Sequence, residues 1–92
     1  EVFVSDARNA RIQVFDLDGN FRRQFGTPGE GSGELGRPMN LTIANGELYV
    51  AEYWNDRIQV FGLDGEPRRI IGEAGSGSTS VAMHQSSNSA HS

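Results

Sequence analysis

Residues 2–26, VFVSDARNARIQVFDLDGNFRRQFG, and residues 48–72, LYVAEYWNDRIQVFGLDGEPRRIIG, are two copies of one unit. Aligned without a gap at a constant spacing of 46 residues, they are identical at 13 of 25 positions. Chance does not give that agreement over so short a stretch. A repeat of this period indicates small structural units that stack, each burying the face that its neighbour leaves open.

Each copy has the pattern of antiparallel β-strands. Residues 11–15 alternate, with Ile12 and Val14 on one face of the strand, and residues 57–61 repeat that alternation. Glycine supplies the positive φ that a tight hairpin turn needs. The sequence places such turns at Asp18-Gly19, Asn45-Gly46 and Asp64-Gly65. The predicted strands are 2–4, 11–15, 20–25, 41–43, 48–50, 57–61 and 66–71.

Together these motifs resemble the NHL repeat. Its pattern is a strand ending in an acidic residue, then Asn-x-Arg-Ile, a strand ending in Phe, an Asp-Gly turn and a strand closing on Phe-Gly. Glu52 and Ile71 depart mildly from it, since Asp and Phe are usual there. The resemblance implies an all-β fold, a β-propeller of usually six blades, each a four-stranded antiparallel sheet. Residues 1–73 would then form two blades, the first without its inner strand.

Seven strands do not close a ring, which leaves two arrangements open. Either the chain is part of a longer propeller, or several copies assemble; three copies of two blades would give a six-bladed homotrimer. Pro67 agrees with this topology, because proline cannot donate to the ladder and belongs on an edge strand such as the outermost strand of a blade.

Residues 74–92, AGSGSTSVAMHQSSNSAHS, differ in character from the repeats. They contain no Asp, Glu, Arg or Lys, and seven of these 19 residues are serine. This composition predicts a flexible tail or linker. The alternative is that Ser80–Met83 forms an inner strand, donated to a neighbouring copy or to the chain's own ring.

The composition argues against several kinds of site. The chain has no cysteine, so it has no disulfide or thiolate metal site. Its formal net charge of −4 argues against nucleic acid as the main partner, and no apolar stretch is long enough to insert across a membrane. His84 and His91 have no ligand partners at suitable spacing, and nothing arranges a nucleophile, a base and an orienting group. We therefore expect no metal, no cofactor and no catalytic residues.

One set of polar residues recurs in both copies at the same spacing. A carboxylate, an amide and a guanidinium together could bind an anion or a sugar. Their repetition instead favours a structural framework, in which the arginine pairs with the carboxylate and the asparagine satisfies loop backbone groups. The framework residues are Asp6, Asn9 and Arg11, with Glu52, Asn55 and Arg57 as their counterparts.

The loop at residues 53–56 differs from its counterpart in the first copy. Tyr53 and Trp54 stand where the first copy has Ala7 and Arg8. Loops on a rigid scaffold carry function, and aromatic loop residues are favoured anchors at interfaces. The alternative is that Trp54 packs on the adjacent blade. The candidate binding residues are Tyr53, Trp54, Arg8 and Asp56.

These observations favour a non-enzymatic scaffold whose loops bind a protein partner or further propeller blades. One alternative is a purely structural ring-forming repeat, natural or engineered. By resemblance, another is a piece of a metal-dependent propeller lyase or hydrolase, which would need histidines or carboxylates near the inner strand that residues 39–43 do not offer. The resemblance also implies RNA binding on a basic face as an alternative, because some NHL propellers bind RNA in this way; the acidic balance of this chain argues against it. Fold alone does not decide among these functions.

Overall fold

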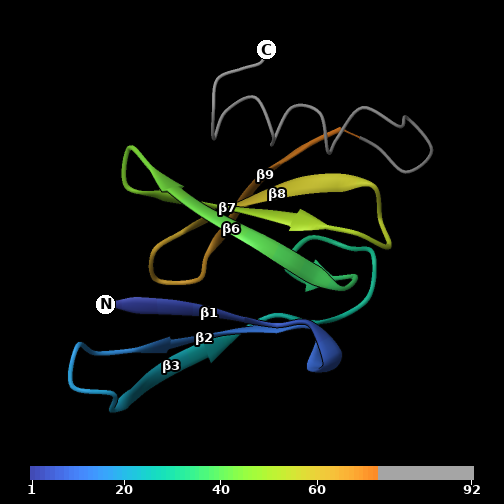
Figure 1. Ribbon diagram of the computed structural model, residues 1–92. Coiled ribbons are helices and arrows are strands. Elements are labelled where there is room, and N and C mark those ends of the chain that lie inside the picture. Colours follow the sequence, from blue (N-terminus) through green and yellow to red (C-terminus); the bar gives the residue numbers. More distant parts are fainter. Residues whose placement is uncertain (73–92) are drawn as a thin grey trace.

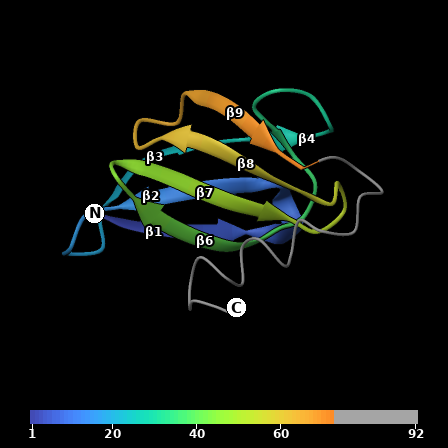
Figure 2. The same cartoon turned by 90° about the horizontal axis from the view of Figure 1, so that it is seen from above.

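The computed structural model describes residues 1–72. The predicted tail and its candidate strand Ser80–Met83 lie outside the described residues. Within the described part, nearly all regular structure is β, and two antiparallel sheets stack as layers (Figures 1 and 2). A glycine-rich linker, residues 26–37, connects the first sheet to the second.

The first sheet has three strands, in the order in which they follow one another in the sequence. They are β1 (Val2–Asp6), β2 (Arg11–Phe15) and β3 (Phe21–Phe25). A single 3₁₀ turn, η1 (Ala7–Asn9), leads from β1 to β2. The β2–β3 hairpin turns at Gly19, whose φ of 91° is the positive value that the Asp-Gly signal predicts.

The second sheet has four antiparallel strands, also in sequence order. They are β6 (Pro38–Ala44), β7 (Glu47–Glu52), β8 (Arg57–Gly62) and β9 (Pro67–Ile71). Pro67 opens the edge strand β9, as its missing N–H predicts. The predicted all-β class is confirmed: the second unit is a complete four-stranded antiparallel sheet, and the first sheet has three strands.

The linker contains two short strands that the sequence pattern does not reveal. These are β4 (Thr27–Pro28) and β5 (Glu34–Leu35), which pair in parallel. The backbone favours glycine between them, because Gly29 has a φ of 151°, which residues with a side chain rarely adopt. Two-residue strands are too short to produce an alternating pattern.

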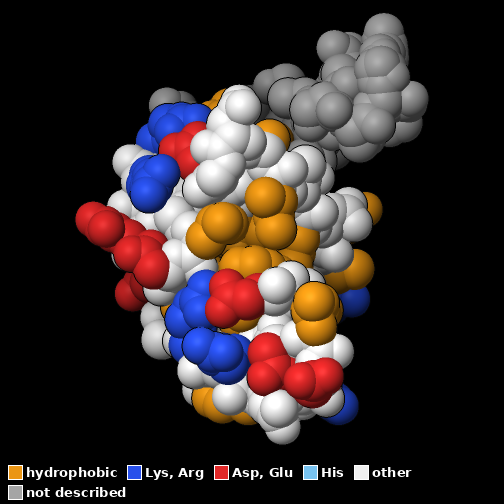
Figure 3. All heavy atoms as spheres, turned by 90° about the vertical axis from the view of Figure 1, so that its left-hand side faces the viewer, with side chains coloured by type: hydrophobic (Ala, Val, Ile, Leu, Met, Phe, Trp, Pro, Cys, Tyr) orange, Lys and Arg blue, Asp and Glu red, His pale blue; other side chains and the backbone are white. Residues whose placement is uncertain are grey.

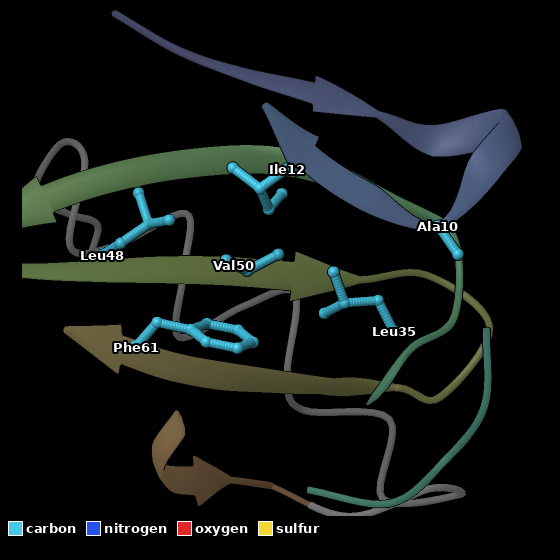
Figure 4. Close-up of a cluster of buried hydrophobic side chains, with 6 residues drawn as sticks. All are labelled: Ala10, Ile12, Leu35, Leu48, Val50 and Phe61. Atoms are coloured by element: carbon cyan, nitrogen blue, oxygen red, sulfur yellow. The ribbon is translucent and has the colours of Figure 1, made fainter. Parts of the chain in front are cut away.

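The hydrophobic core lies between the two sheets. In each sheet we call the face toward the other sheet the inner face and the opposite face the outer face. The rings of Phe25 and Phe61 meet across the interface with their centroids 5.2 Å apart. Figure 4 shows the buried cluster, which is formed by Ala10, Ile12, Leu35, Leu48, Val50 and Phe61.

Strand β8 is buried more completely than its alternating sequence predicts. In β2, buried Ile12 and Val14 alternate with half-buried residues, whereas all six residues of β8 are buried. The linker buries Arg57 and Gln59, because it contacts both side chains on the inner face of β8. Phe61, the third residue that differs from β2, is buried against Phe25 of the first sheet. The same sequence pattern therefore has a different environment in the two sheets.

Candidate functional site

The four candidate binding residues lie at one end of the molecule. Arg8 belongs to η1, and Tyr53, Trp54 and Asp56 belong to the loop between β7 and β8; both connections are at the right-hand end of Figure 1. We call this end the loop end. It draws on both sheets, because η1 follows the first strand of one sheet and the β7–β8 loop lies within the other.

Backbone hydrogen bonds fix the β7–β8 loop against the linker. The N–H of Tyr53 donates to the carbonyl of Arg37 at 3.1 Å, and the N–H of Trp54 donates to the carbonyl of Gly36 at 3.1 Å. The side chains of both aromatic residues point away from the core, since Tyr53 is 64% and Trp54 73% exposed. Trp54 therefore does not pack on the first sheet, and the loop presents two large aromatic surfaces on a fixed backbone.

Arg37 is part of this surface, although it was not among the predicted binding residues. Its guanidinium lies 5.9 Å from the centroid of the Trp54 ring, within cation–π range. Arg37 itself is exposed and has a φ of 53°. Because the linker path brings it to Trp54, nothing in the local sequence pattern could have predicted this contact.

Beneath the loop, a buried polar network holds the linker. It centres on the Glu52 carboxylate, which accepts from Asn55 Nδ2 at 2.7 Å, from Arg57 Nε at 2.8 Å and from Gln59 Nε2 at 3.0 Å. The N–H of Gly36 adds a bond at 3.1 Å. We call Glu52, Asn55, Arg57 and Gln59 the second anchor set.

The same residues reach from the sheet to the linker backbone. Arg57 donates to the carbonyls of Glu30 at 2.6 Å, Gly31 at 3.1 Å and Glu34 at 3.0 Å. Asn55 donates to the carbonyl of Gly29 at 3.0 Å. The second anchor set thus holds the linker on which the β7–β8 loop rests, and Gln59 is a member that the sequence analysis did not select.

The first sheet carries the corresponding residues, Asp6, Asn9, Arg11 and Gln13, which we call the first anchor set. Asn9 Nδ2 and Arg11 Nε donate to Asp6 Oδ2 at 3.1 and 2.8 Å. These bonds, first that from Asn9 and then that from Arg11, lower the pKa of the Asp6 carboxyl. The Arg11 and Asp6 side chains are 34% and 22% exposed, against 9% and 0% for Arg57 and Glu52.

Two ion pairs at the opposite end also repeat with the 46-residue spacing. Arg23 donates to Glu1 at 2.9 Å, and Arg69 donates to Glu47 at 2.9 Å. Hydrogen bonds from Arg69, then from Arg68, hold the pKa of the Glu47 carboxyl at about 2 instead of 4.5. Figure 3 looks onto this end, where charged side chains surround a group of hydrophobic ones.

Arg23 also connects the two sheets, because it donates to the backbone carbonyl of Leu63 in the β8–β9 turn. Neither ion pair was predicted from the sequence. The available signal was the recurrence of Glu1 and Arg23 as Glu47 and Arg69 at the repeat spacing.

Two further predictions concern metals and membranes. Among residues 1–72, no group of three or more His, Cys, Asp or Glu is placed to hold a metal ion. His84 and His91 lie outside that range. No helix in the described part is long and apolar enough to cross a membrane.

A comparison with protein families gives one match. A family model described as a 6-bladed beta-propeller matches residues 1–69, which include β1 to β8 and the start of β9. No curated protein matches the chain.

Proposed function

Because this chain belongs to the 6-bladed β-propeller family, we propose that it is a non-enzymatic binding module that presents its loop end to a protein partner. In this proposal each sheet is one blade, and Tyr53, Trp54 and Arg37 form the centre of the contact. Arg8 and Asp56 extend it toward the first sheet and along the β7–β8 loop. Loops on a rigid β-scaffold are where binding residues concentrate.

The observation that carries the proposal is the exposure of two adjacent aromatic rings on an anchored backbone. Tyrosine, tryptophan and arginine dominate the energetics of protein interfaces. The loop is fixed before binding, since Tyr53 and Trp54 donate their N–H groups to the linker and Asn55 is tied to Glu52. A partner would therefore not have to order this loop, which lowers the entropic cost of association.

We further propose that the repeat is of the NHL type. The Asn-x-Arg-Ile motif supports this assignment, because its asparagine and arginine occupy defined positions in both anchor sets. In the second sheet the same two side chains tie the linker to the sheet. The motif would thus identify a blade whose asparagine and arginine bind the linker that precedes that blade in the sequence.

A display selection on the full chain tests the binding site. Random peptides would be selected on the wild-type protein, and their affinities measured for Trp54→Ala, Tyr53→Ala and Ile43→Ala. Ile43 is the matched control, an exposed apolar residue in β6 near the opposite end of the sheet. We expect the two loop substitutions to weaken binding by about ten-fold or more each, as interface anchors do, and Ile43→Ala to have little effect. Peptides that bind all three variants equally well would refute the proposal.

A second candidate function is a structural repeat that assembles through its sheet faces. One observation favours it: Val2 and Val4 on the outer face of the first sheet are substantially exposed. Isolated exposed apolar residues are ordinary, but two neighbours on one face of a strand suggest a surface that another element covers.

A further inference from the structure

Three arginines in the described part of the chain lie over aromatic rings in the same way. In each pair the guanidinium carbon is 5.9 Å from the ring centroid, which is within cation–π range. The pairs are Arg23 with Phe3, Arg69 with Tyr49, and Arg37 with Trp54. They can therefore be compared as three examples of one arrangement.

Two of these guanidiniums hold a carboxylate with both terminal nitrogens. Arg23 donates to the two oxygens of Glu1 at 2.9 and 3.0 Å. Arg69 donates to the two oxygens of Glu47, each at 2.9 Å. The planar guanidinium matches a carboxylate in this two-bond geometry and can lie over a ring at the same time. In both pairs the arrangement of ring and arginine is thus completed by a glutamate.

The third pair, Arg37 with Trp54, has no carboxylate among residues 1–72. Within that range the Arg37 side chain forms no salt bridge and no hydrogen bond, and its contact is the Trp54 ring. Arg8, in η1 at the same end, is also exposed and also forms no salt bridge with a described residue. The loop end therefore presents two guanidiniums whose N–H donors are not used within the described part of the chain.

The backbone around Arg37 is fixed by both sheets. Its carbonyl accepts the N–H of Tyr53 from the β7–β8 loop at 3.1 Å. The carbonyl of the next residue, Pro38, accepts the hydroxyl of Ser5 in β1, and Pro38 is fully buried. Arg37 thus lies where β1 and the β7–β8 loop meet, with its side chain exposed.

Arg37 also has a backbone conformation that favours glycine. Its φ is 53°, and the proline after it disfavours such a conformation further. Ala10 and Asp56 at the same end have positive φ too, but they occupy equivalent positions in the two copies and belong to the shared turn. Arg37 has no counterpart in the first copy. Residues in such conformations concentrate at ligand sites.

We propose that Arg37 binds a glutamate side chain of a protein partner with both terminal nitrogens, over the Trp54 ring. The inference rests on the proposed function and names the chemistry of the partner: an acidic segment whose apolar side chains pack on Tyr53 and Trp54. Arg8 adds positive charge at the same end. A nucleic acid needs cationic contacts along its backbone, and the described loop end offers two guanidiniums, so the site fits an acidic peptide better.

A thermodynamic cycle between Arg37 and the peptide tests this contact. Random peptides selected on the wild-type chain and weakened by Trp54→Ala would be synthesised with amidated C-termini, so that side chains carry their only carboxylates. Each peptide, and versions with glutamine replacing one glutamate at a time, would be titrated by calorimetry into wild type, Arg37→Gln and Arg22→Gln. Arg22 is the matched control, because it is exposed in β3 near the opposite end and forms no salt bridge within residues 1–72.

We expect the selected peptides to be rich in acidic residues. Replacing the contacting glutamate should weaken binding to wild type and to Arg22→Gln by about five- to ten-fold, and to Arg37→Gln by less than about two-fold. Equal losses in wild type and Arg37→Gln would overturn the inference, while the dependence on Trp54 would still uphold the proposed function. Peptides whose binding is indifferent to Trp54→Ala would overturn both.

Oligouridylate is the second probe, because phosphates also match a guanidinium. We expect it to bind wild type more weakly than the acidic peptides do. Tighter binding of oligouridylate that is lost in Arg37→Gln would assign the guanidinium to phosphates and overturn the inference.

Two further variants test whether Arg37 is kept for its side chain at a cost to the backbone. Arg37→Ala and Arg37→Gly both remove the guanidinium, so both should bind the glutamate and glutamine peptides equally well. Because glycine adopts positive φ freely, Arg37→Gly should melt about 4–8 °C above Arg37→Ala. A melting temperature for Arg37→Gly equal to or below that of Arg37→Ala would contradict the backbone strain at this position.

Discussion

Replacing Arg57 with alanine should destabilise the protein far more than the same change at Arg11. Arg57 is buried against a fully buried Glu52 and also donates to three linker carbonyls. Its removal would leave Glu52 without its cation, and breaking a buried ion pair in this way costs about 3–5 kcal/mol. Domains of this size have total stabilities of roughly 4–11 kcal/mol. Arg57→Ala should therefore approach the limit of folding.

Arg11→Ala is the matched control. The substitution removes the equivalent arginine–carboxylate pair, but among the described residues it removes no hydrogen bond to the linker. The Arg11–Asp6 pair is partly exposed, and such pairs contribute about 0–1 kcal/mol. Thermal unfolding followed by circular dichroism would measure both variants. A melting temperature lowered by at least about 12 °C is expected for Arg57→Ala, and by less than about 8 °C for Arg11→Ala. Equal losses in the two variants would refute the role of the linker contacts.

Three further predictions follow from differences between equivalent positions and from one shifted pKa. Val50→Ala should lower the free energy of unfolding, measured in urea, by about 2 kcal/mol because Val50 is fully buried. Val4→Ala should lower it by less than about half as much, because Val4 is 40% exposed. Equal losses in the two variants would contradict this reasoning. Gly65→Ala should be about 1–3 kcal/mol more destabilising than Gly19→Ala. Both glycines have positive φ, but an added Cβ at Gly65 would lie 2.7 Å from the ring of Phe25, whereas one at Gly19 would meet open space. The Glu47 pKa of about 2 lies below the unfolded value of 4.5, so the unfolded state binds a proton first and stability should fall as the pH drops from 4.5 toward 2. In urea titrations at several pH values, Glu47→Gln should flatten that fall, and an identical pH profile in the variant would show that Glu47 does not cause it.

The strands and turns could be predicted from the sequence because their signals are local. Alternation in β2 and β8 and glycine at the hairpin turns act over a few residues, and the repeat supplied each signal twice. The resemblance to the NHL repeat implied that the first sheet would have three strands and the second four. The short strands β4 and β5 could not be predicted in this way, since the glycine-rich linker has no alternating pattern.

The candidate site was less accessible to sequence reasoning. Tyr53 and Trp54 could be selected because they interrupt the repeat, and the structure places both on the surface. Arg37 was missed because its contact with Trp54 depends on where the linker passes. The different burial of Arg57 and Arg11, at identical positions in the two copies, depends on which sheet the linker covers.

The fluorescence of Trp54 tests most directly whether partners bind at the loop end. Trp54 is the chain's one tryptophan and is largely exposed beside Arg37. A selected peptide would be titrated into the full chain, with binding measured independently by calorimetry and tryptophan emission recorded on the same samples. We predict a blue shift that saturates with the calorimetric isotherm and disappears for a Tyr53→Ala variant that no longer binds. Binding by calorimetry with unchanged Trp54 emission would place the site elsewhere and contradict the claim.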